Sequence, residues 1–186
     1  MANRHLSRSI VLQALFEWDL NAIDKKEVVT ILDRNIEEFA QNKSDRPFME
    51  KLLSGILGKQ SELDLVISKA APEWPIERIS PVDRNILRLG LFELLFSERS
   101  EVPAKVAINE AIELAKQFGG ENSSRFVNGV LGAVYKEIGE PGKDEISKKR
   151  KKEVPYDQMP IQRLAGAVVY AEHEGQMYLA LVHDIF

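Results

Sequence analysis

The residues best suited to chemistry in this 186-residue sequence are cations and one aromatic ring at the starts of two predicted helices. Arg125 and Phe126 follow a Gly119-Gly120 break, with Asn122 shortly before them. An aromatic ring can stack on an unpaired base, while a guanidinium and the free N–H groups of a helix start face phosphate. From these residues alone, a half-buried Phe at the edge of a core is the favoured interpretation, and a nucleic-acid contact is the alternative.

A second group of cations lies near the N-terminus. Arg4, His5 and Arg8 all precede the first acidic residue of the chain. A positive cluster at a helix start is unfavourable toward the helix dipole, so it needs either solvation or an anionic partner. From the residues alone, solvation is the simpler explanation.

Residues 1–138 show no arrangement typical of catalysis. They offer no nucleophile paired with a base, no cluster of metal ligands and no phosphate-binding loop, which favours a binding protein over an enzyme. The chain has no cysteine and only three scattered histidines, His5, His173 and His183. We therefore expect no disulfide, no metal site and no cofactor.

Composition limits the class of protein. The sequence is 44% hydrophobic and 29% charged, as in ordinary globular proteins, and no apolar run is long enough to cross a membrane. The N-terminus lacks the apolar core of a signal peptide, so we predict a cytoplasmic protein.

The net charge of −4 excludes a global positive field, so any RNA contact must be local. Residues 143–152 are a basic run, which predicts a solvated linker able to strengthen RNA binding nonspecifically.

Hydrophobic periodicity predicts the helices that position these side chains. Apolar residues return at intervals of three and four along residues 4–20, 24–41, 48–70, 81–95 and, with one break, 102–138. The most economical architecture is all-α, with two antiparallel helical subdomains packed together.

Local signals mark several helix ends. Ser80-Pro81-Val82-Asp83 predicts a helix start with a capping box and a proline in the first turn. Asp24 is the predicted cap of another helix, and Asn122, Ser123 and Ser124 can cap the helix after the Gly119-Gly120 break. We expect Gly119-Gly120 to end a helix in the left-handed conformation, and Gly90 to let a neighbouring helix approach closely.

Several segments together resemble the NusB family of transcription antitermination factors. They are VAINEAIELAKQFG, SSRFVNGVL, SPVDRNILRLGLFEL and an N-terminal helix with Leu12, Gln13, Ala14, Leu15 and Trp18 in family-like places, so the resemblance covers roughly residues 4–138. Members of this family are all-helical. With the small-subunit ribosomal protein NusE they bind the boxA element of ribosomal RNA leaders and help polymerase read through terminators.

The resemblance implies both the function and the residues that perform it. It implies boxA-type RNA, NusE and an elongation complex with other Nus factors as partners, and it leaves a homodimer open. For RNA it implies Arg4, His5, Arg8, Gln13, Asn122, Arg125 and Phe126. For NusE it implies Phe16 and Asp83, whose structural alternatives are a core aromatic and a helix cap. His5 and Leu6 stand where further arginines are often found in the family, and Asn122 stands where acidic residues are common.

The C-terminal part differs in character from the rest. We expect a helical RNA-binding domain over 1–138, a basic, proline-containing linker over 139–160, and a β-hairpin-like tail over 161–186 with its turn at Glu174-Gly175. The tail is similar to the opening strands of Nudix hydrolases, without their glutamate-rich helix. The alternative function is therefore an RNA-binding targeting module of a larger enzyme, either a methyltransferase type or a Nudix fusion.

Overall fold

The computed structural model describes residues 4–40, 45–142, 169–173 and 176–180. The chain forms two compact units, Met1–Ile146 and Ser147–Phe186. In the first unit the described elements are α1 (Arg4–Asn21), α2 (Val28–Phe39), α3 (Arg46–Gly58), α4 (Gln60–Ala70), the short 3-10 helix η1 (Ile76–Arg78), α5 (Pro81–Phe96), α6 (Ala104–Phe118) and α7 (Ser123–Glu137). In the second unit they are β1 (Val169–His173) and β2 (Gln176–Ala180).

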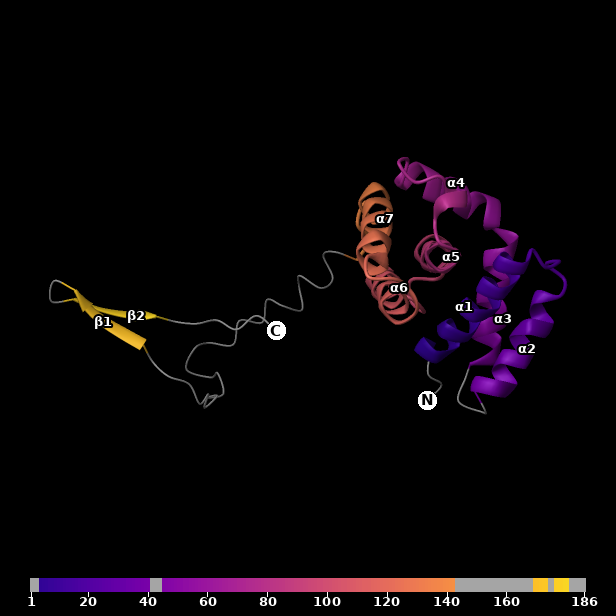
Figure 1. The fold of residues 1–186 in the computed structure, drawn as a ribbon, viewed down its shortest axis with the longest axis horizontal. Coiled ribbons are helices and arrows are strands. Elements are labelled where there is room, and N and C mark those ends of the chain that lie inside the picture. Colours follow the sequence, from indigo (N-terminus) through magenta and orange to yellow (C-terminus); the bar gives the residue numbers. More distant parts are fainter. Residues whose placement is uncertain (1–3, 41–44, 143–168, 174–175, 181–186) are drawn as a thin grey trace. The chain divides into compact units, whose positions relative to one another are not determined.

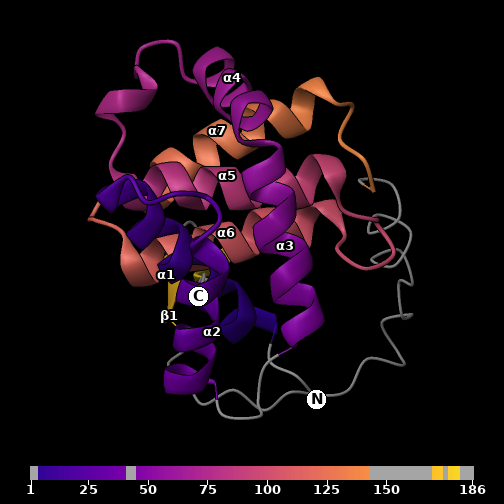
Figure 2. The same ribbon diagram turned by 90° about the vertical axis from the view of Figure 1, so that its right-hand side faces the viewer.

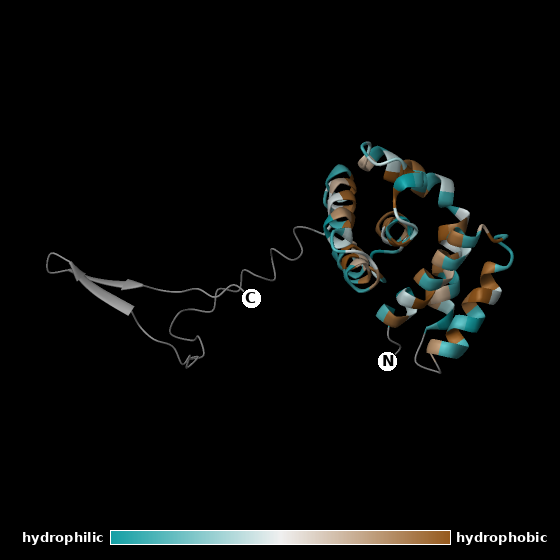
Figure 3. Ribbon diagram, viewed as in Figure 1, coloured by the Kyte–Doolittle hydropathy of each residue, from teal (hydrophilic) through white to brown (hydrophobic). Residues whose placement is uncertain are grey.

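Helix α5 is the centre of the first unit. It packs against α1, α3, α4, α6 and α7, and Figure 1 looks almost along it, with α6 and α7 on one side and α1, α2 and α3 on the other. Figure 2 shows the same helix lengthwise, and Figure 3 shows hydrophobic residues along much of it. Its side chains Ile86, Leu87, Leu89 and Leu91 are completely buried. The predicted all-helical fold of two packed subdomains is confirmed.

Gly90 explains how closely the helices approach α5. A Cβ atom on Gly90 would lie 2.9 Å from the Cβ of Ala111 on α6 and 2.9 Å from a methyl carbon of Leu131 on α7. Both distances are well inside van der Waals contact, so this glycine permits the packing of three helices at one point, as predicted. At the start of α5 the predicted Ser80 cap and first-turn proline are confirmed, since the Asp83 N–H donates to Ser80 Oγ over 3.0 Å and Pro81 occupies the first turn. The described residues show only this half of the predicted capping box, because Asp83 Oδ1 accepts no hydrogen bond there.

Two predicted helices have different bounds in the structure. The single helix expected over 48–70 is two helices, α3 and α4, which meet at Lys59, where ψ is 9° instead of a helical value. Gly58 directly before it lowers the helical preference at that point. Helix α2 begins at Val28, not at Asp24, because the Asp24 carboxylate accepts from the Lys26 N–H over 2.9 Å and holds a turn there instead.

The break between α6 and α7 differs from the prediction in conformation. Gly119 is extended, with φ −90° and ψ −178°, and not left-handed. It is needed for space, since a Cβ there would lie 2.6 Å from the Ala115 carbonyl oxygen. The Asn122 side chain forms no capping hydrogen bond. Instead Ser123 Oγ accepts from the Gly120 N–H over 2.8 Å, so the exposed Asn122 amide is left available for other contacts.

The described strands of the second unit pair antiparallel. Val169 lies opposite Ala180 and His173 opposite Gln176. This is the register of a hairpin around residues 174–175, as the sequence predicted, although that turn, the basic run and the rest of the linker lie outside the described residues.

We predict that Gly90→Ala lowers the free energy of unfolding by about 1–3 kcal/mol, because the added methyl group overpacks the junction of α5, α6 and α7. The matched control is Gly129→Ala on α7, where a Cβ meets nothing within 4 Å; it should raise stability by up to about 1 kcal/mol through helix preference. Urea unfolding followed by circular dichroism measures both. Stabilisation by Gly90→Ala would contradict the close-packing explanation.

Candidate nucleic-acid interface

A pocket of about 350 Å³ lies where α5 and α7 begin. It is formed by the turn after α4, the first turn of α5 and the break between α6 and α7. Its lining residues are Trp74, Arg78, Ile79, Ser80, Asp83, Gly120, Asn122, Ser123 and Phe126.

Two aromatic rings form one wall of this pocket. Phe126 is half-buried and Trp74 is 54% exposed, and their ring centroids are 5.7 Å apart at a tilt of 59°. Phe126 therefore packs against the edge of the core, as the simpler interpretation expected, and also forms an aromatic pair with Trp74 at the surface. Trp74 was missed as a site residue, because its position between two prolines indicated only a connection between helices.

The starts of two helices give this pocket its polar character. Its polar lining residues at these starts are Ser80, Asp83, Asn122 and Ser123. The Asp83 N–H is already bound to Ser80 Oγ and the Ser123 N–H to the Gly120 carbonyl. The Asp83 Oδ1 atom is buried and accepts no hydrogen bond within the described part of the chain. The pocket therefore combines aromatic surface, polar side chains from two helix starts and one unsatisfied acceptor. Arg78 lines the pocket and is exposed, and Arg125, which precedes Phe126 on α7, is also exposed.

The N-terminal cations lie against acidic side chains. Arg4 is 42% exposed at its side chain, 3.8 Å from the Asp45 carboxylate, and its guanidinium lies 4.9 Å from the centre of the Phe48 ring. His5 Nδ1 is 2.9 Å from Glu110 Oε2, and its Nε2 is 3.3 Å from Gln117 Oε1. These contacts join the start of α1 to α6, and Gln117 lies in the last turn of α6 before the break that carries Asn122.

Arg8 differs from its neighbours because it is buried. Its exposed fraction is 3%, and it donates to Glu93 through Nε over 2.9 Å and through Nη2 over 2.8 Å. Burial raises the pKa of the Glu93 carboxyl, while the bonds from Arg8 oppose that shift. This placement corrects the expectation that Arg8 contacts phosphate, since its donors are occupied inside the protein. Its role is to position α1.

The two residues predicted to contact NusE lie near the same end of α1. Phe16 is half-buried on α1, and one turn later Asp19 forms an ion pair of 2.8 Å with Arg84, the neighbour of Asp83 on α5. Gln13, one turn before Phe16, is also half-buried. Asp83 lines the pocket, whereas Phe16 does not.

Comparison with known proteins identifies the fold. The sequence pattern of the NusB family matches residues 5–136, most of the helical unit. The chain belongs to the NusB family.

Several NusB proteins are similar over nearly their whole length. The chain is 43% identical to the transcription antitermination protein NusB of Dehalococcoides mccartyi, over 76% of this chain and 95% of that protein. It is 44% identical to NusB of Chloroflexus aggregans, over 72% of this chain and 87% of that protein.

Solved NusB structures agree with the fold. NusB of T. maritima is 37% identical, with a TM-score of 0.61 over 74% of this chain and 94% of that chain. A chain in the crystal structure of the antitermination factors NusB and NusE in complex with double-stranded RNA is 30% identical, with a TM-score of 0.63 over 72% of this chain and 96% of that chain. The NusB-family match ends at residue 136, and the Nudix resemblance of the tail gains no support from these comparisons.

Among the described residues of this NusB-family chain, no cluster of His, Asp or Glu is arranged to hold a metal ion. Within the same residues, no helix is long and apolar enough to span a membrane.

We predict that Arg8→Met and Glu93→Leu each lower the free energy of unfolding by about 3–5 kcal/mol, because each leaves a buried charge without its partner. The double variant should lose clearly less than the sum of the two, since it buries no charge. Chemical unfolding of all four proteins measures the coupling. Additive losses would show that the ion pair does not hold α1 on α5.

Proposed function

We propose that this NusB-family protein is a noncatalytic, cytoplasmic transcription antitermination factor that binds boxA-type RNA together with NusE. The observation that carries the proposal is the pocket lined by Trp74 and Phe126, open at two helix starts and flanked by exposed arginines. The similarity to a NusB chain from a complex with NusE and RNA supports the same conclusion.

In this proposal the pocket binds an unpaired base. The exposed surface of the aromatic pair offers a stacking platform, which is how single-stranded RNA is commonly bound. Asp83 Oδ1 and the Asn122 amide supply an acceptor and mixed hydrogen-bonding groups for a base edge. Arg125, exposed and without an ion pair among the described residues, is placed at the helix start to contact phosphate.

The N-terminal residues extend this RNA-binding surface, and they differ in the contacts within the protein that they exchange for phosphate. The Arg4 ion pair with Asp45 is long and exposed, so exchanging that carboxylate for a phosphate costs little. His5 Nδ1 lies 2.9 Å from Glu110 Oε2, so His5 binds phosphate by exchanging that carboxylate for it. Gln13 is the remaining proposed RNA-binding residue on α1. Arg8 acts indirectly, because its bond to Glu93 fixes the helix that carries Arg4 and His5.

The same proposal places NusE against the far end of α1. Phe16 offers an apolar contact there, and Asp83 offers a carboxylate on the adjoining start of α5. Because Asp83 also lines the RNA pocket, the two partners would meet along this edge. Binding of one would then order part of the surface used by the other, within an elongation complex that contains the other Nus factors.

We predict that Phe126→Ala weakens binding of boxA-type RNA by about 1–3 kcal/mol through loss of base stacking, with helicity unchanged. Fluorescence anisotropy with boxA-type and scrambled RNA, with and without NusE, measures this change. Phe39→Ala is the matched control, since Phe39 is a 51% exposed ring on α2 away from the pocket. Unchanged boxA affinity in Phe126→Ala would remove the stacking role, and equal binding of both RNAs irrespective of NusE would refute the proposed function itself.

We predict that Arg125→Ala lowers affinity similarly for different RNA sequences and reduces the slope of log affinity against log salt by about 1, as expected for one lost phosphate contact. Lys26→Ala is the control, because Lys26 is another exposed cation without an ion pair in the described part of the chain. Titrations at several salt concentrations give both slopes. A slope that is the same in wild type and Arg125→Ala would rule out this contact.

A further inference from the structure

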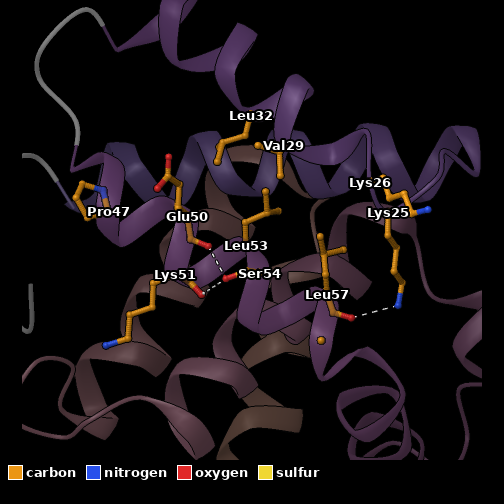
Figure 4. Close-up of a pocket in the computed structure, with 11 residues that line it drawn as sticks. Lys25, Lys26, Val29, Leu32, Pro47, Glu50, Lys51, Leu53, Ser54 and Leu57 are labelled. Atoms are coloured by element: carbon orange, nitrogen blue, oxygen red, sulfur yellow. Dashed lines mark hydrogen bonds between the residues drawn. The ribbon is translucent and has the colours of Figure 1, made fainter.

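A larger cavity, of about 720 Å³, lies between α2 and α3, away from the RNA pocket. It arises because both helices pack on α1 and leave a groove between themselves. The Lys25 ammonium donates to the Leu57 carbonyl over 3.1 Å near one end, and Arg46 pairs with Asp33 near the other. Figure 4 shows the side chains of both helices around the groove.

The floor of this groove is hydrocarbon. Leu32 of α2 and Leu53 of α3 are buried beneath it, Leu57 is half-buried, and Val29 is 51% exposed although it is aliphatic. The part of α3 from Pro47 to Gly58 spans about 17 Å, or roughly three helical turns. A hydrophobic groove of this length between two helices suits aliphatic side chains that recur along one face of a third helix.

The rim of the groove is positively charged. Lys25, Lys26 and Lys51 stand along it. Lys26 has no ion pair among the described residues, and Lys51 has only an exposed contact of 3.1 Å with Glu101. The acidic residue on the rim, Glu50, is bound by Arg46 over 2.9 Å. The rim can therefore attract carboxylates, and the apolar floor disfavours phosphate as the principal ligand.

We propose that this groove binds an acidic amphipathic helix of a partner protein. The aliphatic residues of that helix, at positions i, i+3 or i+4, and i+7, lie on the floor beside Val29 and Leu57. Its Glu and Asp side chains lie on the flanks and face the three lysines. The site uses α2 and α3, whereas the RNA pocket uses α5 and α7, so the partner can bind while RNA is bound.

The experiment is a selection of peptides on the full-length chain. A displayed library of helix-forming peptides of about 14 residues, roughly four turns, is selected on wild type. The enriched peptides are then titrated by fluorescence anisotropy. Val29→Glu places a charge in the groove. Its matched control is Leu65→Glu on α4, because Leu65 is an aliphatic residue of similar exposure, 56%, outside the groove.

We expect enriched peptides with helical apolar spacing and net negative charge. Their affinity should fall at least about ten-fold in Val29→Glu and stay within about two-fold in Leu65→Glu, with RNA binding unchanged in both. In the double variant Lys26→Glu with Lys51→Glu, the selection should turn toward basic peptides. No enrichment, enrichment without acidic residues, or equal effects of Val29→Glu and Leu65→Glu would overturn the proposal. None of these outcomes depends on the RNA result.

Discussion

The buried ion pair between Arg8 and Glu93 is the contact on which the arrangement of the helical unit depends. A buried charge without its partner is costly, so this pair selects one position of α1 along α5. At the opposite end of α1, Asp19 pairs with both Arg84 and Arg88 of α5, over 2.8 Å and 3.2 Å. With both ends fixed, α1 carries α2 and α3, holds His5 against α6 and places Arg4 beside Asp45 and Phe48 at the start of α3. The position of the proposed RNA surface therefore follows from charges that RNA does not touch.

Local sequence signals predicted those features that depend on neighbouring residues. Hydrophobic periodicity predicted the helices. Four residues were enough to predict the Ser80 cap, and the absence of a side chain at Gly90 predicted close helix packing. The features that the sequence did not predict depend on contacts between residues far apart in the chain. Arg8 looks like a solvated cation until the fold places Glu93 against it, 85 positions later. Trp74 becomes a site residue only when Phe126 packs on it, and the extended Gly119 depends on how Ser123 bonds back to the turn.

In the proposal, the distribution of charge explains how a protein of net charge −4 binds RNA. Its N-terminal cations are matched by Asp45, Glu93 and Glu110, so the free protein presents only a weak positive field there. In the proposal, attraction comes instead from short-range groups, namely polar side chains from two helix starts, exposed arginines and stacking surface, which act only when RNA fits. Such a surface favours particular unpaired segments over polyanions in general.

The packing of α2 has a consequence for the motions of the protein. Its principal neighbour is α1 alone, whereas α5 packs against five helices. Elements with few buried contacts open locally at a lower free energy than the core. Amide hydrogens of α2 should therefore exchange with solvent through local opening, while those of α5 exchange only when the whole unit unfolds. One wall of the α2–α3 groove is then adjustable, whereas the proposed RNA pocket rests on α5, which packs against five helices.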